Sequence, residues 1–302
     1  MRIASFLASG TEICVALGLQ ESVVAISHEC DWPPDVLDRP RLSRPRFDPS
    51  GLSSGEIDAA LRQAMQDHGS VYEIDEDLLT QLAPDIILTQ AVCEVCAVPT
   101  PGVRELVARR NLAANVVSLD AHTVQDILDS IVQVGAAADV AGEAADVVAE
   151  IGARIDRVTQ AVAGAPRPRV LALEWLDPPF TPGHWVPEMI ALAGGDNLAG
   201  TAGSHSTETT WDELHDLDPD VLLIMPCGYD LDATKRDAEA ARDRLSAVAP
   251  RAIEQRRAFI VDGSAYFNRS GPRFINGIEI LAGLLHPEVF DAPPADTAAV
   301  WT

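Results

Sequence analysis

The sequence is poor in basic residues: it has one lysine, Lys235, among 22 Lys and Arg residues, against 46 Asp and Glu residues, and its formal net charge is −24. Nucleic acids and anionic membrane surfaces would repel so acidic a chain, so neither is an expected partner. A hydrated acidic surface suits a high-salt cytoplasm, because salt screens the self-repulsion. We therefore expect an acidic, halophilic protein that melts at a higher temperature in molar KCl than in dilute buffer.

The sequence also lacks an apolar stretch of membrane-spanning length. Its first residues, MRIASFLASGTEICVALGLQ, place one arginine before an apolar run, as a secretion signal does. Polar residues interrupt that run between Ser5 and Glu12, and no small-residue cleavage site follows. We expect a strand over 3–7, a helix over 11–17 and a cytoplasmic location without a signal peptide.

Common enzyme signatures are missing as well. The sequence has no P-loop, no G-x-S-x-G elbow, no G-x-G-x-x-G after a strand, and no recognisable order of Ser, His and Asp residues. Five cysteines in 302 residues, in a reducing compartment, do not indicate a disulfide framework. We predict that the protein is not an enzyme and that its cysteines are free thiols.

The sequence does have a regular alternation of strand-like and helical patterns, which is typical of an α/β protein of two domains. Continuously apolar strands are expected where a parallel sheet is covered on both faces. The predicted strands are 23–27, 85–90 and 115–119 in the first half, and 169–175, 220–226 and 257–263 in the second.

The stretch 123–162 contains no proline, and its apolar residues recur at three- and four-residue steps. We predict one long helix there, bent at Gly135 or Gly142 if anywhere. The predicted domains are an N-terminal α/β lobe over 1–121, a connecting backbone helix over 122–163 and a C-terminal α/β lobe over 164–302.

A faint internal repeat supports two lobes of similar build. LTQLAPDIILTQAVC (79–93) matches LHDLDPDVLLIMPCG (214–228) in its Leu-x-x-Leu-x-Pro-Asp pattern followed by apolar residues. In both copies a proline stops a helix and a strand runs to a loop that carries a cysteine. The alternative is that all α/β units share such patterns.

Ligands of open parallel sheets bind beyond the carboxyl ends of the strands, so the loops that follow the predicted strands are the candidate site. If the lobes face each other, Cys93 and Cys96 lie at one wall of a cleft and Cys227 at the other. A redox role for Cys93-x-x-Cys96 is disfavoured, because Pro99 and Pro101 delay the next helix. The pair supplies half of a zinc or iron ligand shell, which Cys227 and His28 or Cys30 would complete. The alternative is that these thiols only pack as small apolar groups.

Two further loops carry candidate ligand contacts. SHECDWPPD (27–35) places His28, Glu29 and Cys30 after a strand, where a solvated turn is the alternative. LEWLDPPFTPGHWVPE (173–188) contains an imidazole beside two indoles, which suits a flat, partly apolar ligand or simple packing. Its candidates are Glu174, Trp175, His184 and Trp185, and the imidazole of His184 is a possible axial ligand of a metal centre.

The segment GSAYFNRSGPR (263–273) offers Tyr266 and Phe267 as apolar walls, and Arg269 and Arg273 as contacts for an anionic group. In so acidic a chain, salt bridges to Asp or Glu are the alternative for the two arginines. The remaining histidines show no ligand-like spacing and are expected to be surface or packing residues: His68, His122, His205, His215 and His286.

Segments along nearly the whole chain resemble the helical-backbone class of ABC-transporter substrate-binding proteins, and more narrowly the vitamin B12 (cobalamin)-binding proteins. The resemblance is carried by SGTEICVALGL, AISHECDWPPDV, LAPDIILTQ, PPFTPGHWVPEMIALAGGDNLAG, LDPDVLLI and YFNRSGPRFINGIEILAGLL. It implies two Rossmann-like lobes joined by a long rigid backbone helix, with a small ligand in the cleft between them and no catalysis. Members of the class carry corrinoids, haem, siderophores or metal ions to a membrane permease.

This chain departs from the exported B12 binders in two respects. The N-terminus has no recognisable signal, which puts an ABC permease as partner in doubt. Thiols occupy the predicted cleft loops, and Ala265 stands where the B12 binders carry an acid. We expect a non-exported binding protein for cobalamin or another corrinoid, or for a related metal-containing ligand. The alternative is a cytoplasmic zinc- or iron-dependent enzyme or metal-binding protein, with Glu29 and Glu174 as candidate acids or bases.

Overall fold

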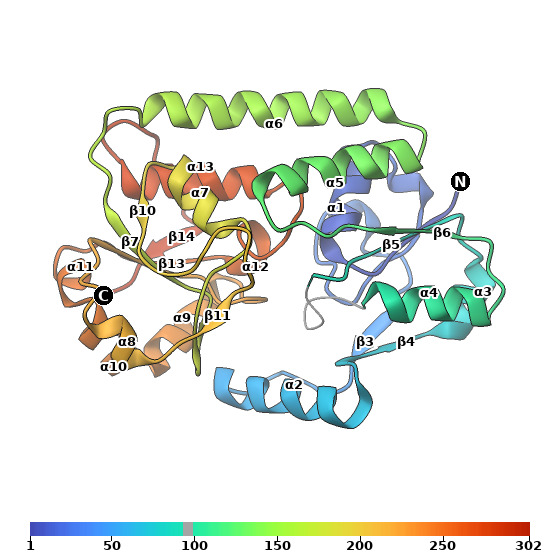
Figure 1. Ribbon diagram of the computed structural model, residues 1–302, viewed down its shortest axis with the longest axis horizontal. Coiled ribbons are helices and arrows are strands. Elements are labelled where there is room, and N and C mark those ends of the chain that lie inside the picture. Colours follow the sequence, from blue (N-terminus) through green and yellow to red (C-terminus); the bar gives the residue numbers. More distant parts are fainter. Residues whose placement is uncertain (93–98) are drawn as a thin grey trace. The chain divides into compact units, whose positions relative to one another are not determined.

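The computed structural model of the protein describes residues 1–92 and 99–302, and the predicted Cys93 and Cys96 fall outside this part of the chain (Figure 1). The contacts divide the chain into two compact units. Unit 1 comprises 1–51, 59–121 and 125–150, and unit 2 comprises 52–58, 122–124 and 151–302. No helix in the described part is long and apolar enough to cross a membrane.

Unit 1 is built on a four-stranded parallel sheet in the order β2-β1-β5-β6. Its strands confirm the predicted ones: β1 (Ile3–Ser5), β2 (Val23–Ala25), β5 (Ile86–Thr89) and β6 (Asn115–Ser118). The connecting elements are α1 (Ala8–Ala16), a ladder of β3 (Ser43–Pro45) and β4 (Tyr72–Ile74), α3 (Glu76–Leu82) and α4 (Thr100–Arg109). Helix α2 (Ser54–His68) begins in the 52–58 part of unit 2 and continues in unit 1. Helix α1 begins three residues earlier than the predicted residue 11, because Leu7 is the N-cap and its carbonyl accepts from the N–H of Thr11.

The core of unit 1 explains its strand pattern. Phe6, Leu42, Leu79 and Ile87 have no exposed surface and pack with Leu106 of α4. All four residues of β5 are buried, as expected of a central strand that is covered on both faces.

Unit 2 is built on a five-stranded sheet in the order β10-β7-β12-β13-β14, in which only β14 is antiparallel to its neighbour. Its strands are β7 (Arg169–Leu173), β10 (Asp196–Asn197), β12 (Val221–Ile224), β13 (Ala258–Val261) and β14 (Ala298–Val300). A small antiparallel sheet adds β8 (Trp175–Leu176), β9 (Pro179–Thr181) and β11 (Thr207–Glu208). The helices are α7 (Val186–Leu192), α8 (Trp211–His215), α9 (Leu231–Ala240), α10 (Arg242–Val248), α11 (Pro250–Glu254), α12 (Gly263–Tyr266) and α13 (Phe274–Leu285).

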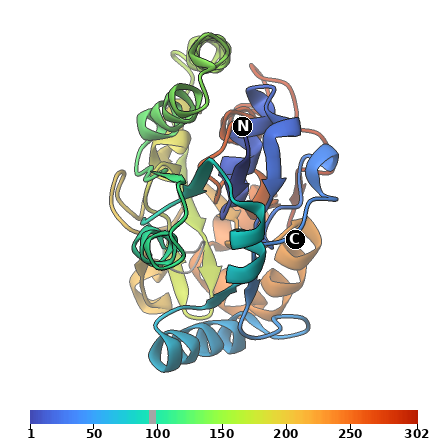
Figure 2. The ribbon, with the colours of Figure 1, turned by 90° about the vertical axis from the view of Figure 1, so that its right-hand side faces the viewer.

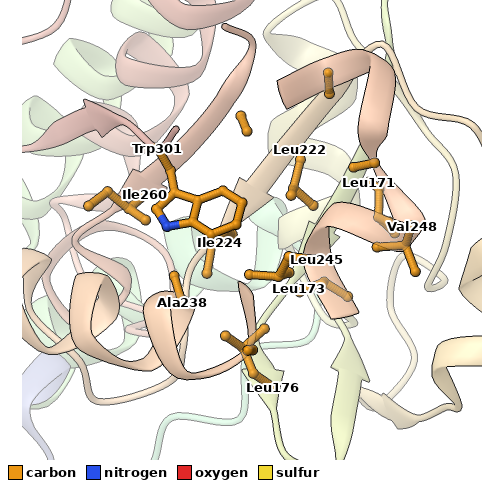
Figure 3. Close-up of a cluster of buried hydrophobic side chains, with 14 of the residues drawn as sticks. Leu171, Leu173, Leu176, Leu222, Ile224, Ala238, Leu245, Val248, Ile260 and Trp301 are labelled. Carbon is orange, nitrogen blue, oxygen red and sulfur yellow. The ribbon is translucent and has the colours of Figure 1, made fainter. Parts of the chain in front are cut away.

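The C-terminal residues complete the core of unit 2. Figure 3 shows the indole of Trp301 among side chains of β12, β13 and α9, including Leu222, Ile224 and Ile260. Trp301 is 2% exposed, and its Nε1 donates to Oε1 of Glu239 at 3.1 Å. The chain end therefore belongs to the packed part of this unit.

The internal repeat appears as the same set of interactions in each unit. In unit 1, Asp85 Oδ2 accepts from the backbone N–H of Arg2 at 2.8 Å, just before β1. In unit 2, Asp220 Oδ2 accepts from the N–H of Arg169 at 2.8 Å, at the start of β7. The residues two positions before these aspartates, Ala83 and Asp218, have φ of 43° and 42°. The Pro-Asp pattern thus ties a central strand to its neighbour in the same way twice.

The predicted single helix over 123–162 consists of two helices, α5 (Val124–Ala137) and α6 (Ala141–Ala161). Figures 1 and 2 show α5 beside α6, and Asp139 between them has φ of 58°. Gly135 permits this approach, because a Cβ there would lie 2.5 Å from the Cβ of Ala144. The long joining helix is α6 alone, about 30 Å of helix, and the boundary between units falls within it at 150/151.

Candidate binding face of unit 2

Three loops that follow parallel strands meet at one end of the unit 2 sheet. Glu174 and Trp175 follow β7, and the N–H of Cys227, after β12, donates to the carbonyl of Glu174 at 3.0 Å. The N–H of Ser264, after β13, donates to the carbonyl of Tyr229 at 3.1 Å. Backbone hydrogen bonds therefore hold the three loops together at the carboxyl ends of the strands, the position at which parallel sheets bind ligands.

An aromatic pair stands on these loops. The rings of Trp175 and Tyr229 are 5.2 Å apart at an interplanar angle of 56°. Trp175 Nε1 donates to the carbonyl of Asp177 at 3.2 Å, and the ring of Tyr229 is half-buried. Burial raises the pKa of Tyr229 to about 12, with the negative charge of Asp237 adding to the effect. The phenol therefore stays protonated and keeps its hydrogen-bond donor at physiological pH.

Two arginines lie after β13. An Nη of Arg269 donates to Oγ of Ser264 at 3.0 Å, and the guanidinium of Arg273 lies 5.7 Å from the ring centre of Tyr266. Burial raises the pKa of Asp262, while its hydrogen bond from Ala265 N–H and the two arginines act in the opposite direction. Both arginines are half-buried.

Trp185 and Phe267 are buried, as is Trp175 with 9% of its surface exposed. Trp185 is 8% exposed and Phe267 has no exposed surface, and the indole Nε1 of Trp185 donates to the carbonyl of Phe267 at 2.7 Å. In this structure both rings pack inside unit 2 and support the loops. Their direct contact with a ligand stays a prediction.

A buried carboxyl group lies next to the aromatic pair. Asp237 of α9 is 9% exposed, and its Oδ1 accepts from the hydroxyl of Ser54 at 2.7 Å, both residues belonging to unit 2. Its Oδ2 is buried and has no hydrogen-bond partner in the described part of the chain. Burial raises the pKa of Asp237; the Ser54 hydrogen bond opposes this and the charge of Asp177 adds to it.

Three histidines gather elsewhere in unit 2. The ring centre of His184 lies 5.6 Å from that of His122 and 5.3 Å from that of His205. The ring centres of His122 and His205 are 5.7 Å apart. Nε2 of His184 is buried and has no hydrogen-bond partner among the described residues. Burial, with the charges of the other two imidazoles, lowers the pKa of His184 to about 4. This imidazole is therefore neutral at physiological pH.

Backbone hydrogen bonds fix the two chain segments that carry His184 and His205 relative to each other. The N–H of His184 donates to the carbonyl of Ser204 at 2.6 Å, and the N–H of Gly203 donates to the carbonyl of His184 at 2.9 Å. Gly183 permits the contact, because a Cβ there would lie 2.3 Å from the Ser204 carbonyl oxygen. His184 itself has a backbone φ of 50°, which is uncommon for residues other than glycine.

The segment that carries the third imidazole, His122, is held by a residue of α7. Oε2 of Glu188 accepts from the N–H of Val124 at 2.6 Å, at the start of α5, two residues after His122. The sequence interpretation singled out His184 but left His122 and His205 as surface or packing residues. A separation of 62 residues between His122 and His184 gives no local spacing to recognise. Gly183 and Gly203 were the only local indication that the segments of His184 and His205 approach each other closely.

The histidine predicted in unit 1 is embedded in local contacts. His28 Nδ1 lies 2.8 Å from Oγ of Ser43, its ring centre is 4.6 Å from that of Tyr72, and its Nε2 lies 3.0 Å from Oε1 of Glu29. Cys30 is 1% exposed, and its Sγ lies 3.2 Å from Oγ1 of Thr11. These contacts explain how the loop is held, and a ligand role for its residues stays a prediction.

The predicted cysteine site remains untested, because Cys93 and Cys96 lie outside the described residues. In the part that the structure describes, no group of three or more His, Cys, Asp or Glu side chains is arranged to hold a metal ion. Cys14 has no exposed surface, and burial raises the pKa of its thiol to about 12. Cys227 is half-buried.

Unit 2 also carries an open cavity of about 750 Å³ between α6, α13 and residues 289–297. Tyr266, Arg157, Glu279 and Phe290 are among its lining residues. Its lining includes none of the residues that follow β7 or β12. Arg154 and Arg157 both pair with Glu279, which ties α6 to α13 beside this cavity.

Comparison with solved structures shows the same fold in several binding proteins. A periplasmic heme binding protein from Pseudomonas aeruginosa is similar over 100% of this chain and 99% of that chain, with a TM-score of 0.74 and 18% identity. The periplasmic vitamin B12 binding protein BtuF of Vibrio cholerae is similar over 94% of this chain and 96% of its own chain, with a TM-score of 0.66 and 19% identity. Helicobacter pylori CeuE with Ni(II) bound is similar over 96% of this chain and 84% of its own chain, with a TM-score of 0.63 and 15% identity.

The search of curated protein sequences gives no match. The family model described as "Periplasmic binding protein" matches residues 3–264. This match and the two α/β lobes agree with the resemblance found in the sequence. The chain belongs to the periplasmic binding protein family.

Proposed function

We propose that this protein binds a corrinoid or a related metal-containing ligand and performs no catalysis on it. The observation that carries the proposal is the aromatic pair Trp175 and Tyr229 on loops joined at the carboxyl ends of β7, β12 and β13. Flat, partly apolar ligands gain free energy from stacking on aromatic rings, and the half-buried ring of Tyr229, packed on the buried Trp175, offers such a surface. The neighbouring loop adds two guanidinium groups for anionic substituents of the ligand.

The similar solved structures support this class of ligand. They include proteins whose titles state vitamin B12 binding, heme binding and bound Ni(II). Each of these ligands is a metal ion or contains one. The three proteins share 15% to 19% sequence identity with this chain. The shared fold therefore supports a small metal-containing cargo, and the side chains of this chain must select among the candidates.

The test is a titration with cyanocobalamin, dicyanocobinamide and haemin, each followed by its own absorption bands. Tyr229→Leu keeps most of the side-chain volume and removes the aromatic face, and Arg273→Gln removes one charge. We expect each variant to weaken binding roughly tenfold or more. Arg104→Gln, an exposed position on α4 of unit 1, is the matched control and should bind like the unchanged protein. Equal affinity in all four proteins would refute the placement of the ligand on this face.

A second candidate function, a zinc- or iron-dependent enzyme that uses Cys93 and Cys96, rests on the sequence pattern. Such an enzyme should retain one equivalent of its metal ion without any added ligand. Elemental analysis of the protein and of a Cys93→Ala, Cys96→Ala double variant separates the two functions. Loss of a stoichiometric ion from a folded double variant would favour the enzyme.

The family suggests a partner, and the acidic composition suggests a location. Family members act with ABC permeases, so a permease is the candidate acceptor for the bound ligand, whereas nucleic acid is not an expected partner. We also propose that the protein works in a cytoplasm of high salt concentration. Fractionation of the native cells, with the protein detected by antibody, tests the location: its appearance on the outer side of the membrane would contradict it.

A further inference from the structure

The cluster of His122, His184 and His205 is not explained by the proposed ligand face, and it belongs wholly to unit 2. We propose that these three imidazoles bind one divalent late-transition-metal ion, such as Zn²⁺, Ni²⁺ or Co²⁺. The site involves none of the four cysteines considered above, and it stands or fails independently of any corrinoid binding.

The spacing of the rings fits a single shared ion. A metal–nitrogen bond is about 2.1 Å, so three imidazoles arranged tetrahedrally around one ion place their ring centres about 5.2 Å apart. The observed separations are 5.3, 5.6 and 5.7 Å. The rings therefore need to approach one another by only a few tenths of an ångström.

The orientation of the rings must change on binding. As the side chains stand, no three such groups in the described part of the chain are arranged to hold an ion. Rotation of a histidine ring about its Cβ–Cγ bond leaves the ring centre nearly in place and redirects both nitrogens, and this torsion is soft. The two imidazole rings of His184 and His205 are now nearly perpendicular, at 88°, so the rotation can bring their nitrogens toward one point.

The environment of His184 favours a small ligand. Its Nε2 is buried and has no hydrogen-bond partner among the described residues, a situation that costs free energy unless a ligand relieves it. A macrocycle is too large to reach a buried nitrogen, whereas a bare ion is small enough. The exposed ring of His205 provides the side from which an ion enters.

The backbone holds the three positions in advance of binding. Hydrogen bonds join residues 183 and 184 to 203–206, and the Glu188 carboxylate fixes the segment that carries His122. The unusual φ of His184 indicates that the surrounding contacts determine its conformation. A preorganised set of ligands loses less conformational entropy when the ion binds.

The chemistry of the groups selects the class of ion. Imidazole suits zinc, nickel, cobalt and copper, whereas magnesium and calcium prefer oxygen ligands. The net charge of −24 also raises the local concentration of cations.

The experiment titrates the full chain, freed of metal by a chelator, with Co²⁺ alone, by calorimetry and visible absorption. We expect one equivalent bound with the d–d bands of tetrahedral cobalt that imidazole ligation gives. His122→Gln, His184→Gln and His205→Gln should each weaken this binding at least about 100-fold, because even the loss of an outer-shell partner costs up to that much. Zn²⁺ should displace the bound Co²⁺.

His215→Gln is the matched control, an exposed histidine of unit 2 beside Asp216, and it should bind Co²⁺ unchanged. Exposed His205 keeps the test valid if the His184 variant fails to fold. Two results would overturn the proposal: no Co²⁺ binding to the unchanged protein, or binding that persists in the folded His205→Gln variant. A sulfur-to-cobalt charge-transfer band in that variant would assign the ion to the cysteines instead.

Discussion

The carboxylate of Glu188 in α7 accepts a 2.6 Å hydrogen bond from the backbone N–H of Val124, the first residue of α5. An anionic acceptor at a helix N-terminus satisfies one of the free N–H groups and interacts favourably with the helix dipole. The same contact holds the segment of His122 in unit 2. One side chain thus links the start of a helix to the histidine cluster.

Replacement of Glu188 by alanine should therefore lower the free energy of unfolding by about 1–2 kcal/mol. Denaturation by urea, followed by circular dichroism, measures the change. Glu143→Ala, an exposed residue in the first turn of α6, is the comparison and should cost less. Equal losses in the two variants would show that the Val124 contact contributes nothing specific.

Gly183 and Gly152 should respond to alanine in opposite directions. A Cβ at Gly183 would lie 2.3 Å from the backbone oxygen of Ser204, so the two segments must separate, at a cost of roughly 1–3 kcal/mol. Gly152 lies within α6 and has no atom within 4 Å of an added Cβ, so alanine there should stabilise the helix by about 0.5–1 kcal/mol. Melting curves of both variants test the pair. A stable Gly183→Ala protein would contradict the close packing beside His184.

The buried carboxyl group of Asp237 should make stability depend on pH. Its folded-state pKa is raised above the ordinary 3.8, mainly by burial. The folded state then holds a proton that the unfolded state has already lost, so stability falls as the pH rises above about 3.8. Asn keeps an oxygen for the Ser54 hydroxyl and carries no charge. Asp237→Asn should therefore be more stable than the unchanged protein at pH 7, by about 1 kcal/mol, and lose this advantage below pH 3.8. An advantage that did not depend on pH would contradict the assignment.

The cysteines should differ in their reactivity toward iodoacetamide. Cys14 has no exposed surface and a thiol pKa of about 12, and Cys30 is 1% exposed, so both should remain unlabelled in the native protein. Cys227 is half-buried and should react first among these three. Mass spectrometry of peptides from timed reactions gives the order, and labelling in denaturant shows that all three thiols can react. Early labelling of Cys14 in the folded protein would contradict its placement.

The sequence predicted the repeating parts of the fold because local patterns determine them. Among the described parallel strands, all but the short β10 (Asp196–Asn197) were found from their apolar runs. The Pro-Asp repeat marks equivalent hydrogen bonds of Asp85 and Asp220 in the two units. The break at Asp139 was missed. Asp139 has φ of 58°, and the N–H of Val140 donates to the carbonyl of Gly135, an arrangement that ends a helix and that the sequence does not mark with a glycine at 139.

The candidate site was predicted in part. The sequence pointed to the loops that follow the parallel strands, and backbone hydrogen bonds join the loops after β7, β12 and β13. The orientation of each side chain depends on tertiary contacts. Phe267 could not be told from an exposed aromatic residue, yet its ring is fully buried. The His122 and His205 partners of His184 come from distant segments, which hydrogen bonds to Glu188 and His184 bring together. No residue spacing in the sequence predicts that these three histidines lie together.

Equilibrium dialysis of the full-length protein against cobalamin, cobinamide and haemin tests the central claim most directly, with absorption spectra and elemental analysis of the retained material. The account predicts one equivalent of a cobalt- or iron-containing macrocycle per chain, with binding weakened by Tyr229→Leu. Retention of none of these ligands by the folded protein would contradict it.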